Sequence, residues 1–223
     1  MQYKGRIITV LIVLLFNLFY TIFYYLRDGY VSWIEYIGYP VMLTLAWWFG
    51  KQYDKAKFYS DKDFLTGIYN RRYVETIFPK IEAITEQNNQ MLAVLILDVN
   101  DFKIVNDVFG HKVGDDYLNA LTNQLKRSVR KTDIVARWGG DEFLIISPDI
   151  QKRDYLDDLM ERIHQNLNDL STKDIEISVS IGAAIFPEEG RTFTDLLKFA
   201  DKNMYQIKSN KMGNHYNISQ TSV

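Results

Sequence analysis

The chain contains no cysteine, which excludes disulfide bonds, thiolate nucleophiles and zinc sites built on thiolates. Histidine is almost as scarce. The three histidines, His111, His164 and His215, do not have the spacing of metal ligands, so a histidine-rich metal site is not expected either. An excess of positive charge is also missing, because 26 basic and 28 acidic residues give a net charge of -2. We therefore expect no binding of nucleic acid through bulk electrostatics.

Apolar residues make up 47% of the 223 residues, and most of the first 50 residues are apolar. The length predicts one domain with an appendage. In the appendage, residues 7–26 form a run of 20 residues without a charge. Because a helix rises about 1.5 Å per residue, this run can cross a hydrocarbon core of about 30 Å. A cleaved signal peptide is the alternative, but it would need small residues where residues 21–25 read Thr-Ile-Phe-Tyr-Tyr. We expect an uncleaved span.

A second apolar run covers residues 31–49, with Glu35 near its start and Pro40 inside it. Trp47 and Trp48 at its far end are typical of an aromatic belt at a membrane surface. We expect a second span, so that residues 1–50 form a transmembrane hairpin. A re-entrant or interfacial helix remains the alternative for this run.

Basic residues flank the outer ends of the predicted hairpin, whereas the short loop between its two spans holds one, Arg27. The flanking residues are Lys4, Arg6, Lys51, Lys55 and Lys57. The excess of Lys and Arg on the cytoplasmic side of membrane proteins predicts that both ends of the hairpin lie in the cytoplasm. The domain that follows is then cytoplasmic, and the protein is expected in a membrane as a multi-pass protein in contact with lipid.

The rest of the chain alternates between helical and strand patterns. Helices are expected at residues 73–88, 115–129, 155–170 and 193–207, and strands at residues 91–97, 134–138, 142–147 and 175–186. The run 91–97 is almost continuously apolar, as in a strand buried on both faces. This alternation predicts an α/β domain with a central mixed sheet.

Three features of this domain suit the handling of phosphates. Asp98 follows the buried strand, the turn Gly139–Gly140 is followed directly by Asp141 and Glu142, and two lysines, Lys103 and Lys208, are available for phosphate. Magnesium prefers carboxylate and phosphate oxygens, and glycines let a backbone approach a phosphate closely. Each feature alone would be a turn, a solvated hairpin or surface charge. Together they indicate a metal-dependent nucleotide enzyme and no more.

Residues 139–143 read Gly-Gly-Asp-Glu-Phe, the signature pentapeptide of the GGDEF family of diguanylate cyclases, and the chain resembles that family from about residue 61 to residue 208. Five further segments match family motifs in family order: residues 63–72, 98–107, 109–115, 178–182 and 200–205. The resemblance implies a single palm-like nucleotide cyclase domain at residues 63–214. It would follow a linker helix at residues 51–62 and precede a tail at residues 215–223.

The resemblance also implies roles for individual residues. Magnesium, or manganese in its place, would be bound by Asp98, Asp141, Glu142 and the carbonyl of Val99. One carboxylate of the pair Asp141 and Glu142 would help to deprotonate the attacking 3′-hydroxyl. The substrate-binding residues would be Asn106 and Asp115 for guanine, Lys103 and Lys208 for phosphate, and Gly139 and Gly140 along the nucleotide cleft. Lys211 competes with Lys208, because the spacing from lysine to glycine in this region departs from the family pattern. Asn100 also departs from it, standing where many members have aspartate.

Arg130 and Asp133 resemble the family's RxxD site, at which the product inhibits the enzyme. Arginine can bind guanine and phosphate, and aspartate can accept hydrogen bonds from the guanine edge. A surface ion pair is the alternative reading of these two residues. As a whole, the resemblance implies a homodimer on a bacterial inner membrane that condenses two GTP into cyclic di-GMP and two pyrophosphates. The alternative is an inactive GGDEF domain that acts as a receptor for GTP or cyclic di-GMP.

Overall fold

The structure, a computed structural model, describes residues 3–30, 32–168, 170 and 177–220, without the side chains of residues 34, 35 and 210–220. The chain divides into two compact units between Asp61 and Lys62. The first unit holds the two N-terminal helices. The second holds one sheet and the remaining helices, and it contains every residue that the sequence predicts for the site.

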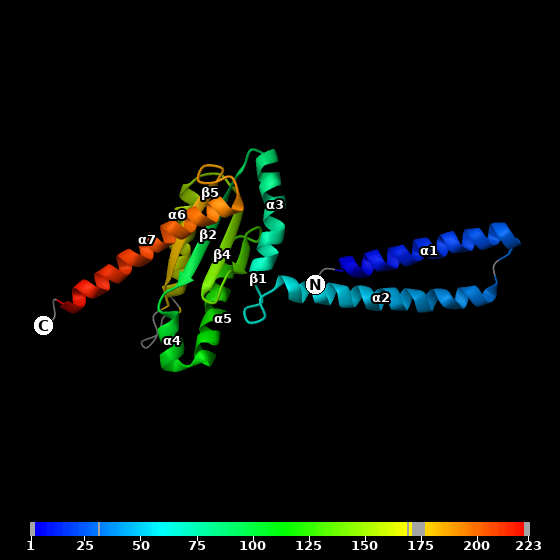
Figure 1. Cartoon of the computed structure of the whole chain (residues 1–223), viewed down its shortest axis with the longest axis horizontal. Coiled ribbons are helices and arrows are strands. Elements are labelled where there is room, and N and C mark those ends of the chain that lie inside the picture. The colour runs from blue at the N-terminus through cyan, green and yellow to red at the C-terminus, as the bar shows by residue number, and fades with distance from the viewer. Residues whose placement is uncertain (1–2, 31, 169, 171–176, 221–223) are drawn as a thin grey trace. The chain divides into compact units, whose positions relative to one another are not determined.

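The first unit is a pair of helices that lie side by side, α1 (Lys4–Asp28) and α2 (Trp33–Asp61) (Figure 1). Gly29 ends α1 with a positive φ of 78°, and its N–H bonds the carbonyl of Tyr25. Helix α2 runs through Pro40 and continues without a break to Asp61. The segment predicted as a linker helix, residues 51–62, is therefore the end of this second helix.

Polar contacts join the two helices at the end where α1 begins. The carboxylate of Asp54 accepts hydrogen bonds from the backbone N–H groups of Gly5 (2.7 Å) and Arg6 (3.4 Å), and it forms an ion pair with the Arg6 side chain at 3.4 Å. It thus caps the start of α1, where N–H groups have no partner inside the helix. Gly50 allows the close approach, because a Cβ there would lie 2.5 Å from Cα of Arg6. Further along, the hydroxyls of Thr21 and Tyr39 lie 2.6 Å apart.

Helix α1 is long and apolar enough to cross a membrane, and most of its surface is exposed, unlike that of a buried core helix. A signal sequence near an N-terminus passes the same test of length and composition. Within the described residues, α2 does not pass it. The prediction of two apolar spans is therefore supported for the first helix alone. The physical reason is that the apolar part of α2, residues 33–50, is itself interrupted by Glu35, Pro40 and several Gly, Tyr and Trp residues, and polar and charged residues follow it.

The second unit is built on a five-stranded mixed sheet with the order β1-β3-β4-β2-β5. Its strands are β1 (Tyr69–Asn70), β2 (Met91–Val99), β3 (Ile134–Arg137), β4 (Glu142–Ile150) and β5 (Val179–Phe186). Strands β1 and β3 are parallel, and the other neighbouring pairs are antiparallel. The predicted mixed sheet is confirmed, with the apolar strand β2 between β4 and β5.

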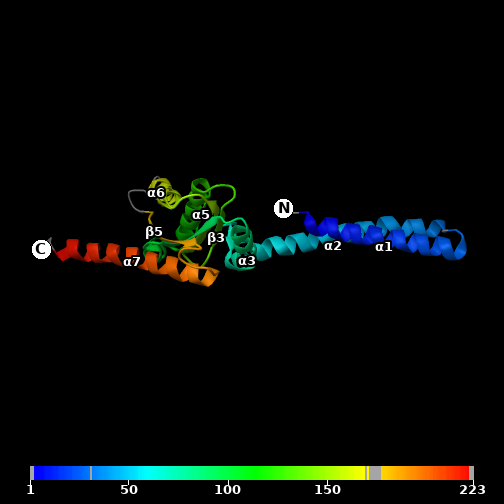
Figure 2. The ribbon, with the colours of Figure 1, turned by 90° about the horizontal axis from the view of Figure 1, so that it is seen from above.

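Helices cover both faces of this sheet. They are α3 (Arg71–Gln87), α4 (Phe102–Phe109), α5 (His111–Ser128), α6 (Asp154–Asn168) and α7 (Phe193–Gln220). Because side chains alternate along a strand, β2 sends Leu95 and Leu97 into a core with α5 and α6, and Val94 and Ile96 into a second core with α3 and α7. Figure 2 shows α5 and α6 on one side of the sheet and α7 on the other.

The predicted helices and strands of this unit agree with the observed ones to within a few residues at most ends. Strand β5 begins at Val179 rather than at the predicted residue 175, and residues 175 and 176 lie outside the described part of the chain. Helix α7 passes the predicted end of the domain at residue 214 and reaches Gln220. Two elements had no counterpart in the prediction. Strand β1 is two residues long, and α4 is a short helix in which Ile104, Val108 and Phe109 are exposed.

Candidate active site

Asp98 and Glu142 stand side by side on adjacent strands. They are direct partners in the antiparallel register of β2 and β4, so their side chains leave the sheet on the same face. Asp98 continues the row that begins with Val94 and Ile96, which faces α7. The two carboxylates therefore extend an apolar row at the end of the sheet, where the core gives way to polar groups.

The turn before β4 holds Glu142 in place. The carbonyl of Glu142 accepts hydrogen bonds from the N–H groups of Trp138 (2.8 Å) and Gly139 (3.2 Å). A Cβ at Gly139 would lie 2.7 Å from Oε2 of Glu142, whereas a Cβ at Gly140 would meet nothing within 4 Å. The two glycines thus differ: Gly139 makes room for the Glu142 carboxylate, and Gly140 leaves open space beside the turn. The sequence had predicted one shared role, the approach of a phosphate.

Arg137 fixes the position of the same turn. Its guanidinium donates hydrogen bonds to the carbonyl of Gly140 at 3.1 and 2.7 Å, and it lies 3.2 Å from the carboxylate of Asp63. Asp63 also accepts from the backbone N–H and the hydroxyl of Thr66. Burial alone would raise the pKa of the Asp63 carboxyl, but the bonds from Thr66 and the charge of Arg137 outweigh it and hold that pKa below its usual value.

Helix α7 approaches β5 closely and brings two charged side chains to the site. A side chain at Gly182 would overlap the backbone of α7 at Ala200 and Met204, so the glycine permits close helix–strand packing. Lys208 of α7 bonds Oδ1 of Asp98. Asp201, one residue after Ala200, lies close enough to Glu142 for its negative charge to raise the pKa of the Glu142 carboxyl.

Negative charge is in excess around Glu142. Partial burial is the main cause that raises the pKa of the Glu142 carboxyl, and the charges of Asp98, Asp141 and Asp201 raise it further, while Lys208 opposes them. A site that gathers carboxylates in this way favours a cation among them.

The residues present fit a hard divalent cation by their chemistry. Asp98, Asp141 and Glu142 offer carboxylate oxygens, the ligands that magnesium prefers, and the backbone of Asp141 is bound to the strand end, since its carbonyl accepts from the N–H of Val99 at 3.1 Å. Among the described residues, however, no three acidic or histidine side chains are gathered as the ligands of an ion. Asp98 is instead engaged by the ammonium group of Lys208.

The predicted guanine-reading residues lie on the helix pair α4 and α5. Helix α4 ends at Gly110, whose N–H bonds the carbonyl of Asn106 at 2.9 Å and whose φ is 86°. The side chain of Asn106 lies directly over Gly114, where a Cβ would overlap its amide oxygen. Asp115 is the next residue along α5 and is exposed. The fold thus brings Asn106 close to the residue that precedes Asp115.

The remaining predicted residues are placed as follows. Lys103 is exposed on the first turn of α4. The side chain of Lys211 lies outside the described side chains. Asn100 follows β2, and its amide is held by two serines, donating to Ser178 at 2.9 Å and accepting from Ser180 at 2.8 Å. Asn100 is therefore used in holding the strand ends together.

Arg130 and Asp133 form a closed local unit. The Asp133 carboxylate is fully buried; it accepts from the N–H of Arg130 at 2.8 Å and from the hydroxyl of Tyr155 at 3.3 Å. The guanidinium of Arg130 is half exposed, stacks over the ring of Tyr155 at 4.3 Å and donates to the carbonyl of Pro148 at 3.2 Å. Both residues line a surface hollow of about 250 Å³ that Lys62, Lys126 and Lys131 also line, so the hollow is basic.

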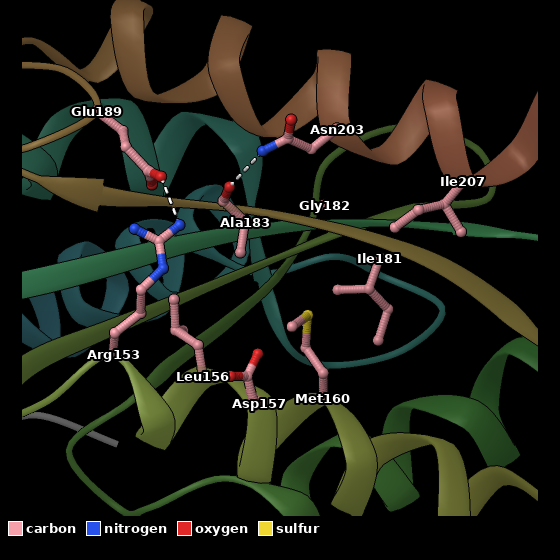
Figure 3. A pocket seen from close by; sticks show the side chains of 10 residues that line it. All are labelled: Arg153, Leu156, Asp157, Met160, Ile181, Gly182, Ala183, Glu189, Asn203 and Ile207. Atoms are coloured by element: carbon pink, nitrogen blue, oxygen red, sulfur yellow. Dashed lines mark hydrogen bonds and ion pairs between the residues drawn. The ribbon is translucent and has the colours of Figure 1, made fainter.

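A second hollow, of about 190 Å³, lies between α6, β5 and α7 (Figure 3). Two of its polar lining groups are engaged by the edge strand: Glu189 accepts from the N–H of Ile185 at 2.8 Å, and Asn203 donates to the carbonyl of Ala183 at 3.1 Å. None of the predicted site residues lines this hollow.

Sequence reasoning missed Arg137, Asp63 and Asp201 as residues of this site, although Asp63 and Asp201 lie inside segments recognised as family motifs. The position of Arg137 could have indicated its role, because a side chain two residues before Gly139 is close enough in sequence to contact the Gly139–Gly140 turn. No local pattern indicates that Asp63 lies against it, because 74 positions separate the two.

The sequence profile described as "Diguanylate cyclase, GGDEF domain" matches residues 60–214. The chain belongs to this family. It is 34% identical over 152 residues to the probable diguanylate cyclase DgcC of Escherichia coli, covering 67% of this chain and 41% of DgcC. It is 33% identical over 153 residues to the response regulator PleD of Caulobacter vibrioides, covering 66% of this chain and 34% of PleD. The chain thus spans well under half the length of these relatives.

Solved GGDEF domains have the same fold. The GGDEF domain of TpbB, also called YfiN, from Pseudomonas aeruginosa matches with a TM-score of 0.63 and 31% identity, covering 67% of this chain and 89% of that one. The coiled coil and GGDEF domain of DgcB from Caulobacter crescentus, solved in complex with c-di-GMP, matches with a TM-score of 0.65 and 23% identity, covering 72% and 86%. At that identity the second match shows the fold alone.

Proposed function

We propose that the protein is a diguanylate cyclase that condenses two GTP into cyclic di-GMP and releases two pyrophosphates. The observation that carries the proposal is the pairing of Asp98 with Glu142 beside the Gly139–Gly140 turn. It places two carboxylates on one face next to a turn that is open on the side of Gly140. Phosphoryl and nucleotidyl transfer need this combination of charge neutralisation and close backbone approach.

Each residue has a role in this reaction. Asn106 and Asp115 would bind guanine, and Lys103 and Lys208 would bind phosphate oxygens. One carboxylate of the pair Asp141 and Glu142 would accept the proton of the attacking 3′-hydroxyl. Asp98, Asp141, Glu142 and the Val99 carbonyl would bind magnesium or manganese, which would neutralise phosphate charge. Arg137 would position the turn through Gly140 and touch no substrate.

A homodimer is part of the proposal. One domain carries one set of these residues, and a cyclic product made from two GTP needs two nucleotides facing each other. A twofold pair of identical domains supplies that arrangement. Specific activity should then fall as the protein is diluted, and covalent or fused dimerisation should prevent the fall, because it raises the effective concentration of the second site.

Membrane attachment through the helix pair is also proposed. The exposed surface of α1 is mainly apolar from Ile7 to Leu26, and this run of 20 residues without a charge is long enough to cross a membrane. The contacts of Asp54 with Gly5 and Arg6 hold α2 against it, so that α2 would enter with α1 as the second span of a cytoplasm-facing, multi-pass protein in the bacterial inner membrane. Fractionation of full-length protein, followed by a carbonate wash, tests this attachment.

The activity itself is tested by incubating detergent-solubilised, full-length protein with GTP and Mg²⁺ and measuring cyclic di-GMP by mass spectrometry. Asp141→Asn is the matched control, because it keeps the size of the side chain and removes one carboxylate. Product from the natural protein and none from the variant is the expected result. Binding of GTP or cyclic di-GMP without any product would favour the receptor function instead.

A further inference from the structure

Lys208 and Asp98 form a direct ion pair at the centre of the proposed metal site. The ammonium group bonds Oδ1 of Asp98, whose side chain is 13% exposed, and the Lys208 side chain is 32% exposed. The pair joins residues 110 positions apart, and it exists because Gly182 lets α7 lie close to β5. The positive charge next to Asp98 thus comes from the protein itself.

A divalent ion that binds Asp98 competes with this pair for the carboxylate. Magnesium needs a direct oxygen–metal contact, and an ammonium group on the same carboxylate would stand against the ion as a like charge. The lysine side chain is long and partly exposed, so it can swing away while α7 stays in place. A released ammonium group also needs a new anionic partner. Glu142, whose pKa the charge of Lys208 lowers, would itself be engaged by the metal, so a phosphate of the bound nucleotide can take that place.

We infer that Lys208 is an exchangeable counter-ion: it holds Asp98 while the site is without substrate, and it moves to a phosphate of a nucleoside triphosphate when the metal–nucleotide complex takes Asp98. The inference rests on the proposed function for the identity of the ligand. It gives Lys208 two successive partners. It also predicts that the site binds a free metal ion less readily than a metal–nucleotide complex. A free metal ion must displace the lysine without offering it a phosphate, whereas a metal–nucleotide complex offers one.

The consequence is a site that binds divalent metal weakly until nucleotide is present. The carboxylate cluster would otherwise attract free cations strongly. Lys208 lowers that attraction, since its charge opposes those of the neighbouring carboxylates.

The test measures Mn²⁺ binding to full-length, detergent-solubilised protein without nucleotide, by electron paramagnetic resonance of free Mn²⁺. Lys208→Met should bind Mn²⁺ about tenfold more tightly than the natural protein, in line with the loss of one partly buried opposing charge. Lys202→Met is the matched control, because Lys202 is an exposed lysine of the same helix and its loss changes the net charge equally. Lys208→Arg keeps the charge and should keep the weak binding.

A second measurement uses a non-hydrolysable GTP analogue with Mg²⁺. Lys208→Met should bind the analogue several-fold more weakly, because the phosphate loses its ammonium partner. The opposite signs of the two effects are the signature of the exchange. Mn²⁺ binding that is unchanged in Lys208→Met, or tightened equally in Lys202→Met, would overturn the inference and leave Lys208 as a simple phosphate contact. Neither measurement depends on turnover, so a failure of the proposed cyclase activity would be seen separately, as absence of cyclic di-GMP.

Discussion

Arg137 joins Asp63 to the Gly139–Gly140 turn. Its guanidinium lies 3.2 Å from the Asp63 carboxylate and donates to the carbonyl of Gly140 at 2.7 Å. Both side chains of the ion pair are 14% exposed, so water competes less for them than for a surface pair. Asp63 stands two residues after the end of α2, which makes the turn dependent on the first residues of the second unit.

Asp63→Asn should lower both the stability of the second unit and the rate of catalysis. An amide accepts weaker hydrogen bonds from Thr66 and Arg137 than a carboxylate does, so the loss should be about 1 kcal/mol and the turnover should fall several-fold as the turn loosens. Because the folded pKa of Asp63 is lowered, its charge stabilises the fold above the ordinary carboxyl pKa, and that stabilisation is lost as the pH falls through the folded value. Thermal melts of variant and natural protein should therefore converge in acid. Equal melting temperatures at neutral pH would contradict the assignment.

Glu142→Gln should abolish synthesis and yet raise the melting temperature. Burial and three neighbouring carboxylates raise the pKa of Glu142, so its ionised form is disfavoured in the fold. That penalty is absent below the unfolded pKa and grows as the pH rises through the folded one. In EDTA at pH 7 the variant should melt roughly 1–4 °C higher, with the difference shrinking toward pH 4, while activity falls about a hundredfold or more. A variant that melts lower at pH 7 in EDTA would show that the carboxylate is stabilised by contacts other than these.

Asp115→Ala should remove the preference for GTP over ATP. A site built to bind the purine edge loses discrimination when one partner is removed, by an amount of about a hundredfold. Asp116→Ala is the matched control, because it removes an exposed carboxylate one position further along the same helix. Competition between the two nucleotides for binding measures the preference. If Asp115→Ala and Asp116→Ala behave alike, the guanine is read elsewhere.

Gly114→Ala tests the same guanine site from the side of Asn106. A Cβ at residue 114 would overlap the Asn106 amide, so the amide must turn away. The KM for GTP should rise several-fold with a smaller change in kcat, because ground-state binding is what the amide supplies. An unchanged KM would show that Asn106 does not contact the nucleotide.

The fold could be predicted where a pattern is local. The apolar run of β2 and the spacing of α5 each identify one element without reference to the rest of the chain. Helix α4 was not predicted, because Ile104, Val108 and Phe109 are exposed and its apolar residues therefore do not mark a buried face. The residue before its first turn, Asp101, has a φ of 54° and makes no side-chain capping hydrogen bond, so no capping motif indicates where the helix begins.

Motifs in the sequence indicate the candidate site residues, but they do not indicate the contacts between these residues. Motif spacing indicates Asp98, Asp141 and Glu142, and strand pairing then brings Asp98 to Glu142. The contact between Lys208 and Asp98 depends instead on how closely α7 packs, which Gly182 decides from another strand. The inward turn of Asp133 likewise depends on Tyr155 of α6. Such contacts follow from packing between distant segments, and no local pattern encodes them.

Arg130→Ala should relieve inhibition by cyclic di-GMP without lowering the initial rate. The Arg130 guanidinium is exposed beside a basic hollow and stands nine positions before Gly139, with β3 between them. We expect a ligand there to act on the arrangement of domains rather than on the chemistry, and such coupling is typically about 5–150-fold. Progress curves with added cyclic di-GMP should stay straighter in the variant, and Arg127→Ala, which removes a neighbouring exposed charge outside the hollow, should leave inhibition intact.

Asp133→Ala should behave differently from Arg130→Ala, although both residues belong to the same motif. The buried Asp133 carboxylate accepts from the Arg130 N–H and from Tyr155, so its loss leaves these donors without their acceptor and should destabilise the fold by about 1–3 kcal/mol. Asp133→Asn keeps the size and one acceptor oxygen, which can serve both donors because both bonds go to the same oxygen, Oδ2, and it should keep the melting temperature closer to that of the natural protein. If the inhibitory ligand contacts Asp133, Asp133→Asn should relieve inhibition as Arg130→Ala does, and the double variant should add little, as expected for residues that share one ligand. If inhibition persists in Asp133→Asn while Arg130→Ala relieves it, Asp133 positions the loop and Arg130 alone meets the ligand. Natural protein that shows no inhibition by added cyclic di-GMP would make the pair a structural ion pair of the loop.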